Sequence, residues 1–582
     1  MADLKRNLVL SVALCACTAA AALAAETAPM TVLIEHYSAD SASLAHAYPL
    51  ALSPASLERF TRLNEDALGA LKGLPFETLD EEGKVDYLLL KNHVERELHT
   101  LNREKKEFEE ADPLIPFAPV IFSLAEAQRL HAVDRPQEDA ASLSKMAKTI
   151  RDTRKAAEAG LQPQPGPGAL HADRIVAYRS AAYVSELRRE LHRWFTFYDN
   201  YDPAFTWWVA EPYKEVDREL EQYSIFLKEQ VAGLKPDDRE TIIGTPIGRD
   251  ALMAALRDAM IPYTPEELIG LAKNEMAWCT KEMIRASREM GDGDDWHKAL
   301  EKVKNSYVPP GEQPELIDKL ALEGIEFAEA HDLVTIPALA KETWTMDMMT
   351  PERQLVNPFF TGGDTISVSY PTDTMTYDQR IMSMRGNNIY FSRSTVFHEL
   401  IPGHYLQQFM NDRYRSYREL FTNPFWLEGN AFYWEMLYWD LGFAKTPEQR
   451  VGMLFWRMHR CARVIFTMSF HLGQMTPAQC VDFLVRDVGH EPDNARAEVR
   501  RSFQEEPDPL YQCAYLLGAL QFRALHKELV DSGKMTNRAF HDAILQEGQM
   551  PVVMVRAILT RETLNASEAP SWRFYEPIAA RP

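Results

Sequence analysis

The chain has 582 residues, with 63 Lys and Arg against 85 Asp and Glu, which gives a formal net charge of −22. Nucleic acids and anionic membranes bind proteins through concentrated positive charge, so this balance argues against both classes of partner. Hydrophobic residues make up 46% of the chain, including 27 Phe and 22 Tyr, so the composition is that of an ordinary folded protein.

An export signal is predicted at the N-terminus. A basic pair at residues 5–6 precedes an apolar run over 8–24, and the run ends in Ala22-Leu23-Ala24, which a signal peptidase accepts. We predict a signal peptide over 1–24 and a mature protein in the periplasm or outside the cell, without stable membrane association. An uncleaved anchor is the alternative, but about 17 apolar residues are short for a membrane span.

The six cysteines leave two questions open. Leu14-Cys15-Ala16-Cys17 partly matches an acylation box, although Cys15 stands where a small residue is usual, so a lipoprotein is a weaker alternative to a cleaved export signal. The remaining cysteines are too scattered to form a disulfide scaffold in so long a chain. Buried free thiols and a single bridge are both open for Cys279, Cys461, Cys480 and Cys513.

Most of the mature chain is predicted to be helical. Ser53-Pro54 has the form of a helix start, a capping residue followed by a proline in the first turn, and apolar residues follow at spacings of three and four. Capping patterns also open predicted helices over about 78–101 and 264–290. The segment 162–168 is rich in proline and glycine, and we expect it to connect two helices as a loop.

The pattern changes between about residues 357 and 394. Residues 365–370 alternate between apolar and polar until Pro371, and 388–391 form a second short run typical of a strand. We therefore predict a small antiparallel sheet directly before the histidine motif described next, and helices again after it. Four tryptophans and a methionine run are predicted to lie in the core, namely Trp207, Trp208, Trp426, Trp434 and residues 346–349.

The segment His398-Glu399-Leu400-Ile401-Pro402-Gly403-His404 has the residue types of a zinc site. Catalytic zinc is held by three protein ligands, His or carboxylate, and keeps a fourth position for water. A carboxylate next to that water, here Glu399, is suited to accept its proton. In the familiar helical arrangement the two His lie four residues apart, and a rotation of about 400° leaves both rings on one face.

Here the two histidines are six residues apart. On a regular helix a rotation of about 600° would place His404 about 120° away from His398, too far to share a metal. The inserted Pro402-Gly403 offers a solution, because proline lacks the N–H of the helical hydrogen bond and glycine tolerates unusual backbone angles. We therefore expect a bulged or kinked helix at 400–404 that returns His404 to the metal face.

A candidate third ligand lies further along the chain. Glu428 follows His404 by 24 residues, within an otherwise mostly apolar and aromatic run. An unpaired carboxylate would be costly to bury there, and a cation is its natural partner. Glu435 lies seven residues after Glu428 on the same helix face, where it either orients a histidine or forms a salt bridge.

These motifs resemble a known family. The His-Glu-x-x-Pro-Gly-His segment followed by Leu406-Gln407, and the Glu-Gly-x-Ala-x-Tyr-x-Glu run at 428–435, resemble the bacterial domain of unknown function 885 family, DUF885. Segments at 261–268 and 332–337 also resemble family segments, so the resemblance extends over roughly residues 30–570. That family is in turn similar to helical zinc peptidases of the gluzincin group.

The resemblance implies a set of roles for this chain. His398, His404 and Glu428 would hold one Zn²⁺ ion and Glu399 would act as the general base. The strand expected at 388–391 would border the cleft, where a peptide substrate adds as an extended strand.

Two later segments match the family only in part. Arg463 and His471 fall on a family pattern, with departures from it between them. Tyr515 matches a late Tyr-x-x-Gly element, and Tyr511 departs from it. Zinc peptidases need a donor to the oxyanion, so Tyr515 is the candidate, with a core tyrosine as the alternative.

The sequence thus predicts a mainly α fold, helical and metallopeptidase-like, with a small antiparallel sheet next to the active-site helix. Residues 25–582 form one domain, with two subdomains at about 25–250 and 251–582 flanking a cleft as a further option. The expected activity is that of an exported zinc peptidase acting on short peptides. The alternatives are a zinc hydrolase of a non-peptide amide and an inactive binding protein of the same fold. The end of the peptide that is attacked and the oligomeric state stay open.

Overall fold

The computed structural model describes residues 29–575, except 134, 237, 239, 355–356, 506–507 and 568–569. The predicted signal peptide over 1–24, with Cys15 and Cys17, lies outside the described residues. Within the described ranges, no helix is both long enough and apolar enough to cross a membrane.

The fold is mainly α-helical, as the sequence predicts. The helices of the first half are α2 (Pro29–Ala47), α3 (Pro54–Gly73), α4 (Glu81–Ala111), α5 (Ala118–Arg129), α6 (Pro136–Gly160), α7 (Arg174–Tyr198), α8 (Pro203–Phe226), α9 (Gly248–Asp258) and α10 (Pro265–Glu289). The next are α11 (Trp296–Lys304), α12 (Gln313–Ala330), α13 (Ala338–Thr343), α14 (Pro351–Gln354), α15 (Tyr377–Gly386), α16 (Ile389–Glu399) and α17 (His404–Asn411). The last are α18 (Pro424–Asp440), α19 (Pro447–His471), α20 (Pro477–Phe483), α21 (Pro492–Arg500), α22 (Tyr511–His526), α23 (Asn537–Glu547) and α24 (Val552–Thr560).

Several helices begin at the caps read from the sequence. Ser53 caps α3 through its side chain, and Thr264 heads a capping box at the start of α10. Asp80 caps α4, which continues well beyond the predicted end near Leu101. The proline-rich and glycine-rich segment 162–168 connects α6 to α7, which confirms the predicted loop.

The small sheet differs from the predicted one. Strand β2 (Thr365–Val368) forms where a strand was expected, but it pairs in parallel with β1 (Thr345–Met348) rather than with residues 388–391. The prediction for 388–391 is wrong, because the Asn388 side chain accepts hydrogen bonds from two N–H groups of the first turn of α16 and so starts a helix. The antiparallel arrangement survives only as an isolated bridge between Thr361 and Ser367.

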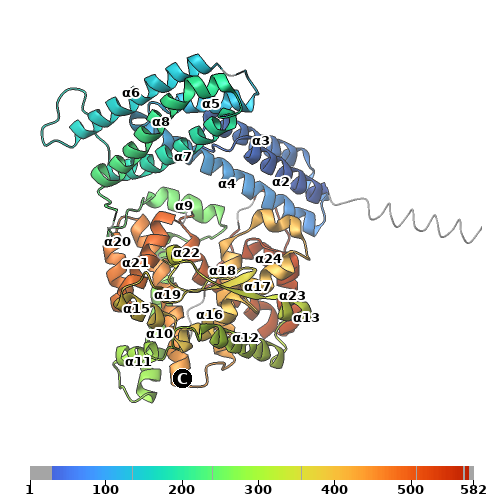
Figure 1. Cartoon of the computed structure of the whole chain (residues 1–582). Helices are drawn as coiled ribbons and strands as arrows, with labels where there is room; N and C mark the ends of the chain where they lie inside the picture. The colour runs from blue at the N-terminus through green and yellow to red at the C-terminus, as the bar shows by residue number, and fades with distance from the viewer. Residues whose placement is uncertain are drawn as a thin grey trace, which may run out of the picture.

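The helices bury two main cores. Figure 1 shows α2 to α8 as an upper layer above a larger lower body. Leu50 and residues 111–227, mainly from α5 to α8, form the smaller core. Residues 30–94 contribute instead to the larger core, together with residues 252–574. The subdomain division near residue 250 stays a prediction, and the cores place the first helices with the second half of the chain.

Residues expected in the core divide into two groups. Trp426 and Trp434 are buried, and so are all four described cysteines, which are free thiols. Trp207 and Trp208 are 81% and 45% exposed, so their predicted place in the core is wrong. The buried face of α8 is set by residues spaced three and four apart, and both tryptophans fall outside it. In the methionine run, Met349 is buried but Met348, in β1, is 40% exposed.

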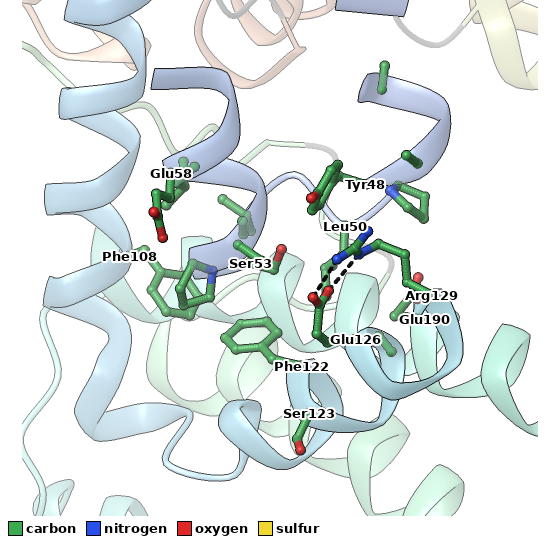
Figure 2. A pocket seen from close by; sticks show the side chains of 18 of the residues that line it. Tyr48, Leu50, Ser53, Glu58, Phe108, Phe122, Ser123, Glu126, Arg129 and Glu190 are labelled. Atoms are coloured by element: carbon green, nitrogen blue, oxygen red, sulfur yellow. Dashed lines mark hydrogen bonds and ion pairs between the residues drawn. The ribbon is translucent and has the colours of Figure 1, made fainter. Parts of the chain in front are cut away.

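The upper layer contains a cavity of about 1660 Å³, bordered by α3, α4, α5, α7 and the chain after α2. Figure 2 shows its apolar walls, which include Tyr48, Leu50, Phe108 and Phe122. Some of its charged groups pair with each other: Arg129 donates two hydrogen bonds to Glu126, at 2.6 and 2.7 Å. The walls therefore combine apolar surface with ion pairs between lining residues.

Candidate metal centre

The predicted helix distortion at 400–404 is a complete break between two helices. Helix α16 ends at Glu399 and α17 begins at His404. The intervening turn is closed by hydrogen bonds from the Gly403 N–H to the Phe397 carbonyl, at 3.0 Å, and from the Leu406 N–H to the Leu400 carbonyl, at 3.2 Å. The expectation of one bulged helix was therefore wrong in form, although His404 does return to the side of His398.

Gly403 lies where the backbone folds back on itself between the two histidines. A Cβ atom at this position would lie 1.8 Å from the carbonyl oxygen of His398. Only glycine lets the backbone fold back this closely, and the fold-back brings the ring centroids of His398 and His404 to 5.0 Å.

Glu428, on α18, completes a group of three converging atoms. Its Oε2 lies 3.1 Å from Nε2 of His404 and 3.6 Å from Nε2 of His398. All three side chains are buried, with exposed fractions below 10%. Glu428 and His404, which are 24 residues apart in the chain, therefore lie side by side as predicted.

The other nitrogen of each imidazole has a partner that fixes its tautomer. Nδ1 of His398 donates to Glu435 Oε1 at 2.9 Å. Nδ1 of His404 donates to Gln407 Oε1 at 3.0 Å, because the amide nitrogen of Gln407 donates elsewhere, to Leu427 O and Asn430 Oδ1. In a neutral imidazole the proton is then on Nδ1, so both Nε2 atoms point lone pairs at Glu428.

Three acceptors aimed at one point repel each other unless a positive charge lies between them. The pKa shifts express the same electrostatics. Burial disfavours the charged form of His404, but Glu428 and Glu399 outweigh burial and raise its pKa to about 9. Burial likewise opposes ionisation of Glu428, yet the two histidines hold its pKa well below the usual range. The donor set therefore fits a cation.

Glu399 lies beside this group without belonging to its tightest part. Its Oε2 is 4.0 Å from Nε2 of His404. The ligand atoms of His398, Glu399 and His404 all lie within 4.8 Å of one another, so Glu399 borders the same point in space. The loop before β2 packs over it, since a Cβ on Gly362 would lie 2.4 Å from Glu399 Oε2. Burial raises the pKa of Glu399, and the two histidines oppose that effect.

Two tyrosines of α22 hold the second oxygen of Glu428. Tyr511 and Tyr515 both donate to Glu428 Oε1, at 2.5 and 2.8 Å. These contacts depend on a close crossing of α18 and α22, where a Cβ on Gly429 would lie 2.5 Å from the Cα of Gly518. Tyr515 thus reaches the site as the sequence predicted, and Tyr511, a departure from the family element, reaches it as well.

The site opens into a pocket of about 250 Å³. The pocket is lined by the histidines and glutamates named above, by both tyrosines, by the loop over residues 357–363, and by Arg460, Arg463 and Arg501. Arg460 also donates to Glu435, at 3.0 Å. Glu435 therefore does both things left open by the sequence: it orients His398 and forms a salt bridge.

Other sequence expectations end differently. His471 is buried next to Phe470 and Phe503, outside the pocket, and burial lowers its pKa to about 4. The cleft border expected at 388–391 is helical, and the non-helical segment that lines the pocket is 357–363 instead. Sequence reasoning missed Arg460 and Arg501. Arg460 stands one helix turn before Arg463, which was a usable signal, whereas no motif pointed to Arg501.

The comparisons with known proteins identify a family and a fold. The family described as "Bacterial protein of unknown function (DUF885)" matches residues 43–559. No curated protein matches the chain. A solved structure from Shewanella oneidensis, provisionally described as a lipoprotein of unknown function, is similar with a TM-score of 0.65 and 17% identity. That similarity covers 92% of this chain and 100% of the other.

A second solved structure, from Colwellia psychrerythraea, is also provisionally described as a lipoprotein. It is similar with a TM-score of 0.57 and 15% identity, over 91% of this chain and 98% of that one. At these identities the two structures establish the helical fold and nothing about activity.

Proposed function

Because this chain belongs to the DUF885 family of bacterial proteins and holds the site described above, we propose that it is an exported zinc-dependent peptidase acting on short peptides. The observation that carries the proposal is the convergence of two imidazole lone pairs and one carboxylate oxygen, with both imidazoles fixed from behind. Ligands that are oriented by such partners are typical of metal centres.

Zinc is the ion that this donor set favours. Two imidazoles and one carboxylate are the protein ligands of many catalytic zinc sites, which keep the remaining position open. Here the remaining side faces the pocket of about 250 Å³. The similarity of the motifs to gluzincin-type peptidases supports the same assignment of His398, His404 and Glu428.

The proposed reaction is hydrolysis of a peptide bond. Zinc supplies Lewis acidity, which lowers the pKa of water and polarises a carbonyl group. Glu399 accepts the proton of the attacking water and then gives it to the leaving amine. Burial raises the pKa of Glu399, which suits a group that must both accept and donate a proton near neutral pH. Tyr515 is the candidate donor to the oxyanion, by releasing its hydrogen bond to Glu428.

The export part of the proposal rests on the N-terminal pattern. The basic pair, the apolar run and the small residues before residue 25 are those of a secretory signal. The two solved relatives are both described provisionally as lipoproteins, which keeps acylation at Cys17 as the alternative to cleavage at residue 24.

Two measurements test the activity. Metal analysis of the purified protein is expected to give about one zinc per chain, as a single three-ligand site requires. A peptide library incubated with the zinc-loaded protein is expected to show cleavage products. A metal-free protein that binds no added zinc would refute the site. Zinc binding with hydrolysis of other amides, or with no hydrolysis, would select one of the two alternative functions.

A further inference from the structure

One wall of the metal-site pocket carries three guanidinium groups. Arg460 and Arg463 lie one turn apart on α19, and Arg501 begins the short π-helical segment η6 (Arg501–Glu505) that follows α21. All three line the pocket that also contains His398, His404 and Glu399. Positive charge therefore gathers directly beside the proposed reaction centre.

The three arginines differ in how far the protein itself satisfies them. Arg460 donates to Glu435, and Arg463 donates through Nε to Glu498, at 2.6 Å; among the residues that the structure describes, the terminal nitrogens of Arg463 have no hydrogen-bond partner. Within the described ranges, Arg501 forms neither an ion pair nor a side-chain hydrogen bond; its guanidinium carbon lies 5.9 Å from the Tyr511 ring centroid.

The charges of the pocket do not balance within the protein. Glu435 offsets Arg460, and Glu498 offsets Arg463. Glu399 and Glu428 together offset the two charges of a divalent ion. Within the described residues, Arg501 is then left without an ion-pair partner of its own, and an anionic ligand in the pocket would supply one. The ligand that fits carries one negative charge.

We propose that Arg501 and the free nitrogens of Arg463 bind the α-carboxylate of a peptide, so that the protein acts as a carboxypeptidase. This inference rests on the proposed peptidase function. Guanidinium groups bind carboxylates through paired, charge-assisted hydrogen bonds. Arg463 is held for this task by Glu498 on one side and by the Tyr515 ring, 4.3 Å away, on the other.

The small size of the pocket selects the α-carboxylate among anionic groups. The metal ligands and both arginines share a volume of about 250 Å³, so the anion must lie close to the bond that is cut. Every free peptide carries its α-carboxylate next to its last peptide bond, whatever its sequence. An acidic side chain would meet the same requirement only in particular sequences.

The test compares two peptides of identical sequence, one ending in a free acid and one in an amide, both acetylated at the N-terminus. The zinc-loaded wild type is expected to cleave the acid with a kcat/KM about 10- to 100-fold higher, as loss of a charged hydrogen-bond partner implies. Arg501→Gln is expected to raise KM for the acid much more than KM for the amide and so to remove most of this preference. Arg486→Gln is the control, because Arg486 is a surface residue paired with its neighbour Asp487.

Three results would overturn the inference. The first is equal cleavage of acid and amide by the wild type, which needs no variant and so no assumption about folding. The second is a fall of kcat for both peptides in Arg501→Gln, which would indicate that the arginine stabilises the reaction itself. The third is cleavage at internal bonds without regard to the C-terminus.

A binding measurement separates this inference from the proposed function. Zinc-loaded Glu399→Gln protein is titrated with the same two peptides by calorimetry. Tighter binding of the acid supports the carboxylate site even if no peptide is ever hydrolysed. Equal binding of the two peptides, or no binding of either, would refute the carboxylate site while leaving zinc-dependent hydrolysis to be judged by its own assay.

Discussion

A cavity of about 1660 Å³ lies among α3, α4, α5 and α7, and the pocket at the paired histidines has about 250 Å³. In the large cavity several charged side chains pair with each other, as in Glu126–Arg129 and Glu190–Arg193. In the small pocket two imidazoles share one carboxylate oxygen of Glu428, and within the described residues Arg501 has no ion-pair partner. Polar groups that are available to a ligand therefore indicate a functional site better than the volume of the cavity does.

The largest effect is expected from exchanging a carboxylate in each region. Glu399→Gln removes the proposed proton acceptor, so hydrolysis should fall by about 10²- to 10⁴-fold while zinc stays bound. Glu126→Gln breaks an ion pair in the wall of the large cavity and should leave both properties unchanged. Peptide assay and metal analysis of the same preparations check the pair. Full activity of Glu399→Gln would contradict the proposed difference between the small pocket and the large cavity.

The next effect contrasts two glycines. Gly403→Ala places a Cβ 1.8 Å from the carbonyl oxygen of His398, so the turn between the histidines must move, and we expect a destabilisation of about 3 kcal/mol. Gly69→Ala on α3 meets nothing within 4 Å and should stabilise by about 1 kcal/mol, through helix propensity. Denaturant unfolding measures both. If Gly403→Ala also raised the free energy of unfolding, the turn would have room for a side chain, against this expectation.

The smallest effect concerns the residues behind the ligands. Glu435→Gln weakens the acceptor of the His398 Nδ1 proton, and zinc affinity should fall about 10- to 100-fold. Glu190→Gln changes a carboxylate that is also buried but pairs only with Arg193, and should not change zinc affinity. Competition with a chelator measures both. Unchanged affinity in Glu435→Gln would mean that Arg460 and the surrounding helices alone hold His398 in place.

The parts of the site that the sequence predicted are those with local spacing. His398, Glu399 and His404 lie within seven residues, and Glu428 was found because a carboxylate in an apolar run needs a partner. The same reasoning predicted a bulged or kinked helix at 400–404, whereas two separate helices form. It did not find the steric role of Gly403, because a clash with the carbonyl of the residue five positions earlier is a three-dimensional fact that no residue pattern records.

The parts that were missed depend on contacts between distant segments. Residues 388–391 alternate like a strand, but the capping side chain of Asn388 decides for a helix. The partner of β2 is β1, whose pairing is parallel and so leaves no hairpin turn in the sequence to find. Arg501 enters the pocket from a segment with no motif at all, and only the fold brings it beside the histidines.

The geometry of the site depends on how closely α18 and α22 approach each other where they cross. Gly429 and Gly518 carry no functional atom, yet a methyl group on either would force the two helices apart. Tyr511 and Tyr515 would then be withdrawn from Glu428, from which Tyr511 is 83 residues distant in the chain. Gly429 and Gly518 thus set the distance between the tyrosine hydroxyl groups and the carboxylate of Glu428.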